Sequence, residues 1–197
     1  MKASESTNRI KYLFLDIDGV LWTVGWSIFC NRNGGRSERR CYTEWDPMVT
    51  SNLQWVLDQA KEQGVEVRIV ISSTWRLGRT LEELKVIAEK SGLDPNSIIG
   101  KTPSIYYKVP KTKWYWKSWG PWYGRIFPFR SKRTEADRGV EIQYWMDQNN
   151  IKAEDIAIID DDSDMAHLKH RHVKTDAYDG LGFRKAIEVA KRLGVRD

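Results

Sequence analysis

The chain has 197 residues, of which 41% are hydrophobic and 30% charged, and its formal net charge is +5 at pH 7. This composition is typical of one globular domain with room for a small appendage. From the polar N-terminal stretch and the absence of long apolar runs we expect neither a secretory signal nor a membrane-spanning helix, and two cysteines are too few for a disulfide framework. We therefore expect a cytoplasmic protein with free thiols and no membrane partner.

Strands and helices alternate along most of the chain. Two helix starts are marked by local sequence, an Asp46-Pro47 N-cap and a capping box formed by Thr80 and Glu83. In chain order we expect a strand at 11–17, a helix from Asp46 to Gly64, a strand at 65–72, a helix from Thr80 to about Gly92, a short strand at 97–102, a helix at about 134–149, a strand at 156–160 and a helix at 181–193. This order predicts an α/β fold with a central parallel sheet covered by helices.

Two segments interrupt the alternation, 22–45 and 102–133. Both are expected beyond the carboxyl ends of strands, where open α/β sheets bind ligands. We interpret 22–45 as a flap region and 102–133 as a lid inserted into a core made of 1–101 and 134–197.

The segment 102–133 differs sharply in composition from the rest of the chain. It contains eight Lys or Arg, no Asp or Glu and ten aromatic residues, so it carries +8 and leaves −3 for the remainder. Aromatic faces stack on bases and cations contact phosphates, so the segment is interpreted as a nucleic-acid platform rather than a lid that only packs on itself.

Three predicted strands end in polar clusters, DIDG at 16–19, SSTWR at 72–76 and DDDSD at 160–164. Parallel strands would bring these clusters to one crevice, where carboxylates repel one another unless a divalent cation lies between them, and oxygen ligands suit Mg²⁺. Ser72 adds a hydroxyl and Arg138 a cation. These groups together are what transfer of a phosphoryl group to a carboxylate requires.

The same motifs resemble those of the haloacid dehalogenase (HAD) superfamily of phosphatases: DIDGV, IVISS, Arg138 and IIDDDSDM. More narrowly, DIDGVL, ISSTWR, RGVEIQYW, IIDDDSDM and TDAYDGLG are similar to the HAD-type domains of RNA-repair proteins and their stand-alone phage and bacterial relatives. The similarity covers nearly the whole chain except the basic insert. It implies a HAD-type Rossmann-like three-layer sandwich.

The resemblance also implies roles for individual residues. Asp16 would be the nucleophile that forms an aspartyl-phosphate, and Asp18 the general acid and base. Ser72 would bind phosphoryl oxygens and Arg138 would stabilise their charge. Asp161 would ligate Mg²⁺ together with Asp16 and the carbonyl group of Asp18.

Two assignments keep alternatives. Asp160 competes with Asp161 as the direct metal ligand, because many members of the superfamily have Gly-Asp at this position, and Lys132 or Arg133 competes with Arg138 as the cation. The expected substrate contacts are Ser73, Arg76, Lys113, Trp114, Trp116 and Lys117.

The predicted function is a Mg²⁺-dependent phosphatase acting on phosphorylated nucleic-acid ends or nucleotides. One alternative is a small-metabolite phosphomonoesterase, and another is a non-catalytic nucleic-acid-binding protein on a HAD fold. The intact Asp16 and Asp18 pair argues against the non-catalytic alternative. The oligomeric state is not predicted.

Overall fold

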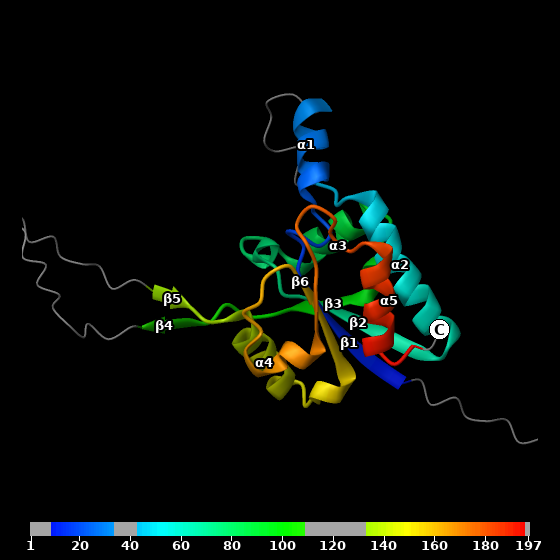
Figure 1. The fold of residues 1–197 in the computed structure, drawn as a ribbon. Helices are drawn as coiled ribbons and strands as arrows, with labels where there is room; N and C mark the ends of the chain where they lie inside the picture. The colour runs from blue at the N-terminus through cyan, green and yellow to red at the C-terminus, as the bar shows by residue number, and fades with distance from the viewer. Residues whose placement is uncertain (1–8, 34–42, 109–132, 196–197) are drawn as a thin grey trace, which may run out of the picture.

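A computed structural model describes residues 9–33, 43–108 and 133–195. Its centre is a five-stranded sheet in the order β3-β2-β1-β6-β7, in which every neighbouring pair is parallel (Figure 1). The strands are β1 Arg9–Leu15, β2 Val65–Ile71, β3 Ile98–Lys101, β6 Ile156–Asp160 and β7 His172–Lys174. The predicted parallel α/β sheet is thus confirmed. Strand β7 was not predicted, because its three residues are too few to show the alternation of buried and exposed side chains that is typical of a strand.

The central strand β1 shows how the sheet divides two hydrophobic clusters. Successive strand side chains point to opposite faces, so Leu13 and Leu15 enter one cluster while Phe14 enters the other. Helices α2 Pro47–Glu62, α3 Leu81–Lys90 and α5 Phe183–Arg192 contribute to the first cluster. Helix α4 Arg138–Gln148 and the 3₁₀ helix η4 Ala166–Arg171 cover the other face, which gives three layers.

Both predicted helix starts are confirmed. Asp46 caps α2 by accepting a hydrogen bond from the Met48 N–H at 3.0 Å, and its other carboxylate oxygen accepts one from the Thr23 hydroxyl at 2.8 Å. The Thr80 and Glu83 capping box begins α3. These caps were visible in the sequence because all but the Thr23 contact are local.

The segment predicted as a flap contains a helix, α1 Val24–Asn33, which projects from the top of the molecule in Figure 1. The end of the same segment belongs to the core, because Trp45 is fully buried in the cluster formed with α2, α3 and α5. The large indole ring of Trp45 buries much apolar surface in the core, which favours this position over an exposed flap.

The basic segment is attached to the core through a two-stranded antiparallel ribbon, β4 Tyr106–Lys108 and β5 Arg133–Glu135. The helix expected from about 134 therefore begins later, at Arg138, because 133–135 pair with β4 instead. Residues 109–132 lie outside the described ranges, so the expected contacts of Lys113, Trp114, Trp116 and Lys117 and the alternative cation Lys132 stay predictions.

Short 3₁₀ helices complete the described ranges: η1 Thr74–Arg76, η2 Pro95–Ser97 and η3 Ala153–Asp155. Within these ranges, no helix is both long and apolar enough to cross a membrane.

Candidate active site

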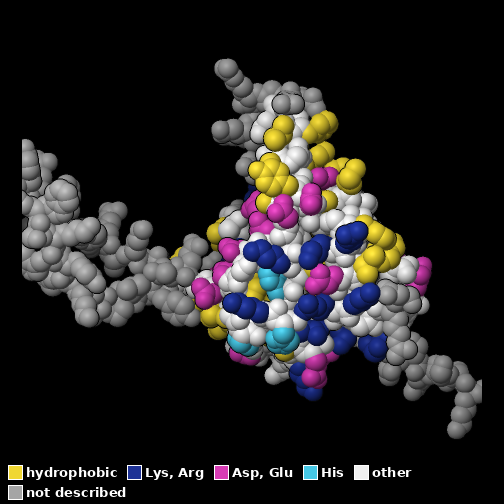
Figure 2. All heavy atoms as spheres, in the orientation of Figure 1, with side chains coloured by type: hydrophobic (Ala, Val, Ile, Leu, Met, Phe, Trp, Pro, Cys, Tyr) yellow, Lys and Arg dark blue, Asp and Glu magenta, His cyan; other side chains and the backbone are white. Residues whose placement is uncertain are grey.

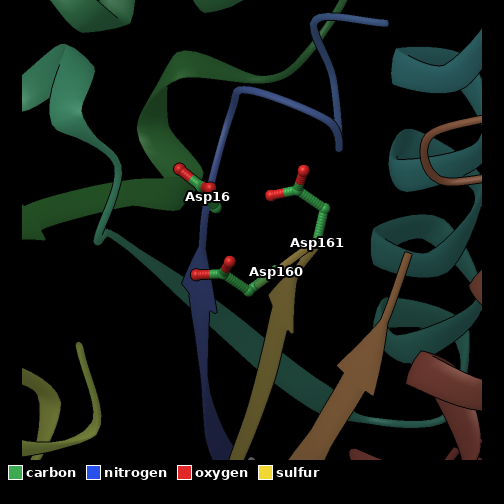
Figure 3. Close-up of side chains that lie close together, drawn as sticks. All are labelled: Asp16, Asp160 and Asp161. Atoms are coloured by element: carbon green, nitrogen blue, oxygen red, sulfur yellow. The ribbon is translucent and has the colours of Figure 1, made fainter. Parts of the chain in front are cut away.

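Three carboxyl groups meet at the carboxyl ends of β1 and β6. Asp16 follows β1 directly, Asp160 is the last residue of β6, and Asp161 comes next (Figure 3). One oxygen atom from each lies within 4.8 Å of the other two. The backbone hydrogen bonds between β1 and β6 hold this arrangement, since the Asp16 N–H donates to the Ile159 carbonyl oxygen at 3.0 Å.

Burial makes these carboxyl groups costly to ionise without a cation. It raises the pKa of Asp160 to about 8, with the negative charge of Asp16 as the next cause. Burial likewise raises the pKa of Asp16, although Arg138 opposes the shift, and the pKa of Asp161 is raised for the same first reason.

The donor set fits a divalent cation. Oδ1 of Asp16 and Oδ2 of Asp160 are buried and accept no hydrogen bond from any described residue, and the single positive charge that these residues place within 4 Å of them, that of Arg138, has more than one carboxyl group to balance. Buried carboxylate oxygens left in this state are stabilised by a cation that binds them directly, and a set made only of oxygens suits a hard cation. Asp160 and Asp161 are both close enough to Asp16 to take part.

Gly19 allows Asp161 to approach the first motif. A Cβ atom on Gly19 would lie 2.2 Å from Oδ2 of Asp161. The backbone at Gly19 has φ +67°, a conformation that residues with a side chain rarely adopt. The glycine of DIDG is therefore needed both for the turn and for the contact between the two acidic motifs.

Arg138 supplies a cation to the carboxylate cluster. Its Nη1 lies 3.3 Å from Oδ1 of Asp16 and its Nε 3.5 Å from Oδ2 of Asp160. Nη1 also donates to the carbonyl oxygen of Ser72. Of the cations considered from the sequence, Arg138 is thus placed in the crevice, while the side chain of Arg133 and all of Lys132 are outside the described part of the chain.

The fourth motif positions the start of α4 and therefore Arg138. The carboxylate of Asp164 accepts the Arg138 N–H at 3.0 Å, and its carbonyl oxygen accepts the Gly139 N–H at 3.1 Å. Helix N-termini need such acceptors, because their first N–H groups have no partner within the helix. Gly139 permits the approach, since a Cβ atom there would lie 2.3 Å from the Met165 carbonyl oxygen.

The carboxyl group of Asp18 is bound by the second motif. Nε1 of Trp75 donates to its Oδ1 at 2.9 Å, and the Thr74 hydroxyl donates to its Oδ2 at 3.1 Å. Trp75 is itself buried, 5.7 Å from the ring of Trp22 and 4.8 Å beneath the guanidinium of Arg79. The two donors fix the orientation of the Asp18 carboxyl group.

Ser72 and Ser73 both lie fully buried after β2. The Ser72 N–H donates to the Leu15 carbonyl oxygen at 2.9 Å, while its hydroxyl has no described hydrogen-bond partner. Ser73 caps the 3₁₀ helix η1. A hydrogen bond from its side chain lowers the pKa of Asp16, although burial and Arg138 affect this pKa more strongly. The prediction that Ser72 and Ser73 lie at the carboxyl end of a strand is therefore confirmed, and that strand, β2, is a neighbour of β1.

Arg76, expected to contact substrate, is buried and bonded to protein groups. Its guanidinium donates to the carbonyl oxygens of Ser72, Ser73, Thr102 and Pro103 and, at 2.5 Å, to the carboxylate of Glu141. Arginine has five N–H donors in this group, so all are used. Glu141 also accepts the Ile105 N–H at 3.0 Å, so the pair ties the second motif to the chain that leads into β4.

Three residues in the site were not singled out from the sequence: Thr74, Asp164 and Glu141. Thr74 and Asp164 lie inside the polar clusters SSTWR and DDDSD, so a signal for them was present. Glu141 lies inside RGVEIQYW, one of the motifs that carry the resemblance, but its burial was not readable from the sequence, because an acidic residue inside a helix is ordinarily on the surface.

The sequence between residues 12 and 186 matches a family model described as the HAD domain in Swiss Army Knife RNA repair proteins. The match spans most of the chain, and the chain belongs to this family of HAD domains. Neither the curated proteins nor the solved structures that were compared include a match.

Proposed function

We propose that the protein is a Mg²⁺-dependent phosphatase that removes phosphate from nucleic-acid ends or nucleotides through an aspartyl-phosphate on Asp16. The observation that carries the proposal is the convergence of Asp16, Arg138 and the two fourth-motif carboxyl groups at one sheet edge. A nucleophilic carboxylate beside a fixed cation is the arrangement that phosphoryl transfer needs.

In the first step, a carboxylate oxygen of Asp16 attacks phosphorus and the bond to the leaving oxygen breaks. Arg138 stabilises the charge on the transferring oxygens, for which the buried Ser72 hydroxyl is a further partner. Asp18 gives its proton to the leaving alkoxide and becomes a carboxylate. Trp75 and Thr74 donate to this carboxylate, so their hydrogen bonds strengthen as the proton leaves.

In the second step, water attacks the phosphorus atom of the aspartyl-phosphate. Asp18 accepts a proton from the water, the bond to the Asp16 oxygen breaks, and inorganic phosphate and the free carboxylate are formed. The cycle returns both aspartates to their initial protonation states.

Asp16, Asp160 and Asp161 are the residues that would hold Mg²⁺. When bound, the ion supplies positive charge that stabilises the phosphoryl group in the transition state and favours the ionised form of the carboxyl groups.

Three features support a nucleic-acid substrate over a small metabolite. The family is that of HAD domains in RNA repair proteins, and the segment 102–133 carries +8 with ten aromatic residues. Figure 2 also shows Lys and Arg side chains gathered over the face formed by η4, β7 and α5. Lys174 on this face donates to the Ser163 hydroxyl of the fourth motif at 2.7 Å, which brings the face to the edge of the crevice.

The test is phosphate release from a panel of 3′- and 5′-phosphorylated RNA and DNA oligonucleotides, mononucleotides and sugar phosphates. We expect the highest kcat/KM for one class of phosphorylated oligonucleotide or nucleotide. Equal or better turnover of sugar phosphates would favour the small-metabolite alternative. Binding without turnover of any substrate in the presence of Mg²⁺ would favour the non-catalytic one.

A further inference from the structure

A groove of about 740 Å³ lies between α4 and the chain that leads into β4. We call it the stem groove, and its lining includes Ile105, Tyr106, Val140, Gln143, Tyr144 and His167. Its size falls in the range of sites that bind small molecules or parts of larger ligands.

The stem groove adjoins a smaller pocket on the Arg138 side of the candidate active site. This pocket of about 70 Å³ includes Thr74, Arg138 and Asp164, and it shares Ser104 and Tyr106 with the groove. A molecule whose phosphate lies beside Arg138 can therefore extend past Tyr106 into the groove.

The walls of the groove are aromatic and aliphatic. Tyr106, from β4, is 46% exposed and Tyr144, from α4, is 50% exposed, and both line the groove together with Ile105 and Val140. Exposed tyrosine rings of this kind offer flat faces on which a planar ring can stack.

Hydrogen-bonding groups of the groove are held in place along α4. The Gln143 carbonyl oxygen lies 2.7 Å from Nε2 of His167, and its amide donates to Asp147 at 2.6 Å. Among the described residues that line the groove, none is Lys or Arg. The described lining therefore suits an uncharged aromatic ring with polar edges better than a second phosphate.

We propose that the stem groove binds the nucleobase next to the phosphorylated end, by stacking on Tyr106 and Tyr144, while Arg138 and the carboxylate cluster take the phosphate. This proposal rests on the proposed function and assigns a site for the leaving group of that reaction. A purely aliphatic phosphate ester reaches the phosphate site alone and gains nothing from the groove.

The experiment measures binding and turnover separately. Asp16→Asn provides a protein that binds without turnover, and its Kd for 3′- and 5′-phosphorylated dinucleotides is compared with that for glycerol phosphate. Tyr106→Ala and Tyr144→Ala are each introduced into this background and into the active protein. Tyr144→Phe keeps the ring, and Phe183→Ala removes an exposed aromatic from α5, on the other face of the sheet.

We expect each tyrosine-to-alanine change to weaken dinucleotide binding by roughly 5- to 150-fold, the effect typical of losing one stacked base. Tyr144→Phe and Phe183→Ala should bind within about twofold of the parent. In the active protein, Phe183→Ala should leave kcat/KM for glycerol phosphate unchanged, and each tyrosine-to-alanine change should lower kcat/KM for the dinucleotide far more than for glycerol phosphate.

Three results would overturn the inference. If dinucleotides are preferred over glycerol phosphate and both alanine variants keep that preference, the groove is not the base site, although the proposed function stands. If the wild type shows no preference for dinucleotides, the proposed nucleic-acid substrate fails and the inference fails with it. If Tyr144→Ala instead converts a dimer to a monomer in size-exclusion chromatography with an unchanged Kd, the groove binds a second copy of the chain.

Discussion

Replacing Trp75 by phenylalanine tests whether the second motif controls the proposed general acid. The change removes the hydrogen bond of 2.9 Å from Nε1 to Oδ1 of Asp18 but keeps a ring beside Trp22 and beneath Arg79. The Thr74 hydroxyl remains as a donor to the other oxygen of Asp18.

The magnitude follows from the charge on Asp18. A hydrogen bond to a charged group contributes about 1.5 to 3 kcal/mol. This bond gains strength as Asp18 loses its proton in the transition state, so its loss should lower kcat by roughly 10- to 150-fold. KM should change little, because Trp75 is buried and its Nε1 is bonded to Asp18 rather than exposed to substrate.

The assay is steady-state hydrolysis of a phosphorylated oligonucleotide and of glycerol phosphate. Trp55→Phe is the matched control, since Trp55 packs against Phe183 away from the crevice. Urea unfolding checks that both variants fold. A Trp75→Phe enzyme with normal kcat, alongside an inactive Asp18→Asn enzyme, would refute the positioning role of Trp75.

Four further outcomes are expected. Asp16→Asn should fold and release no phosphate, because an amide is not a nucleophile, and near-normal turnover would rule out the covalent intermediate. A chelator should stop activity and Mg²⁺ should restore it, with Asp161→Ala needing more Mg²⁺; full activity in excess chelator would contradict the proposed metal site. In metal-free protein, Asp160 keeps its proton to about pH 8 when folded and loses it near 3.8 when unfolded. The free energy of unfolding should therefore fall as the pH rises from about 4 to 8, and a urea-unfolding series in which Asp160→Asn shows the same fall would exclude this cause. Glu141→Gln should lower the free energy of unfolding by about 3 kcal/mol, because it leaves the buried Arg76 unpaired, and an unchanged urea midpoint would show that the pair is dispensable.

The main strands and their order in the chain were predictable because their signals are local. Apolar runs marked β1, β2 and β6, and the start of α2 was marked by residues only two positions apart. The exceptions are the short strands, β4, β5 and β7, which have three residues each. Such strands carry too few residues for a pattern and form only because a partner strand is present.

The candidate site was predictable to the extent that parallel strands place their carboxyl ends together. That rule brings Asp16, Ser72 and Asp160 to one edge once the strands are recognised. It does not say which carboxyl groups touch, and the structure places both Asp160 and Asp161 within reach of Asp16.

The sequence by itself determined the longer strands and the starts of α2 and α3, because helix caps, strand periodicity and the DIDG turn depend on neighbours in the chain. Only the tertiary structure decided what those residues contact. Trp75 reaches Asp18 across 57 positions, and Arg76 reaches Glu141 across 65. Contacts between residues so far apart in the chain depend on how the elements pack. Packing also sets the burial that raises the pKa of Asp160. Neither the contacts nor the pKa can therefore be predicted from neighbouring residues in the sequence.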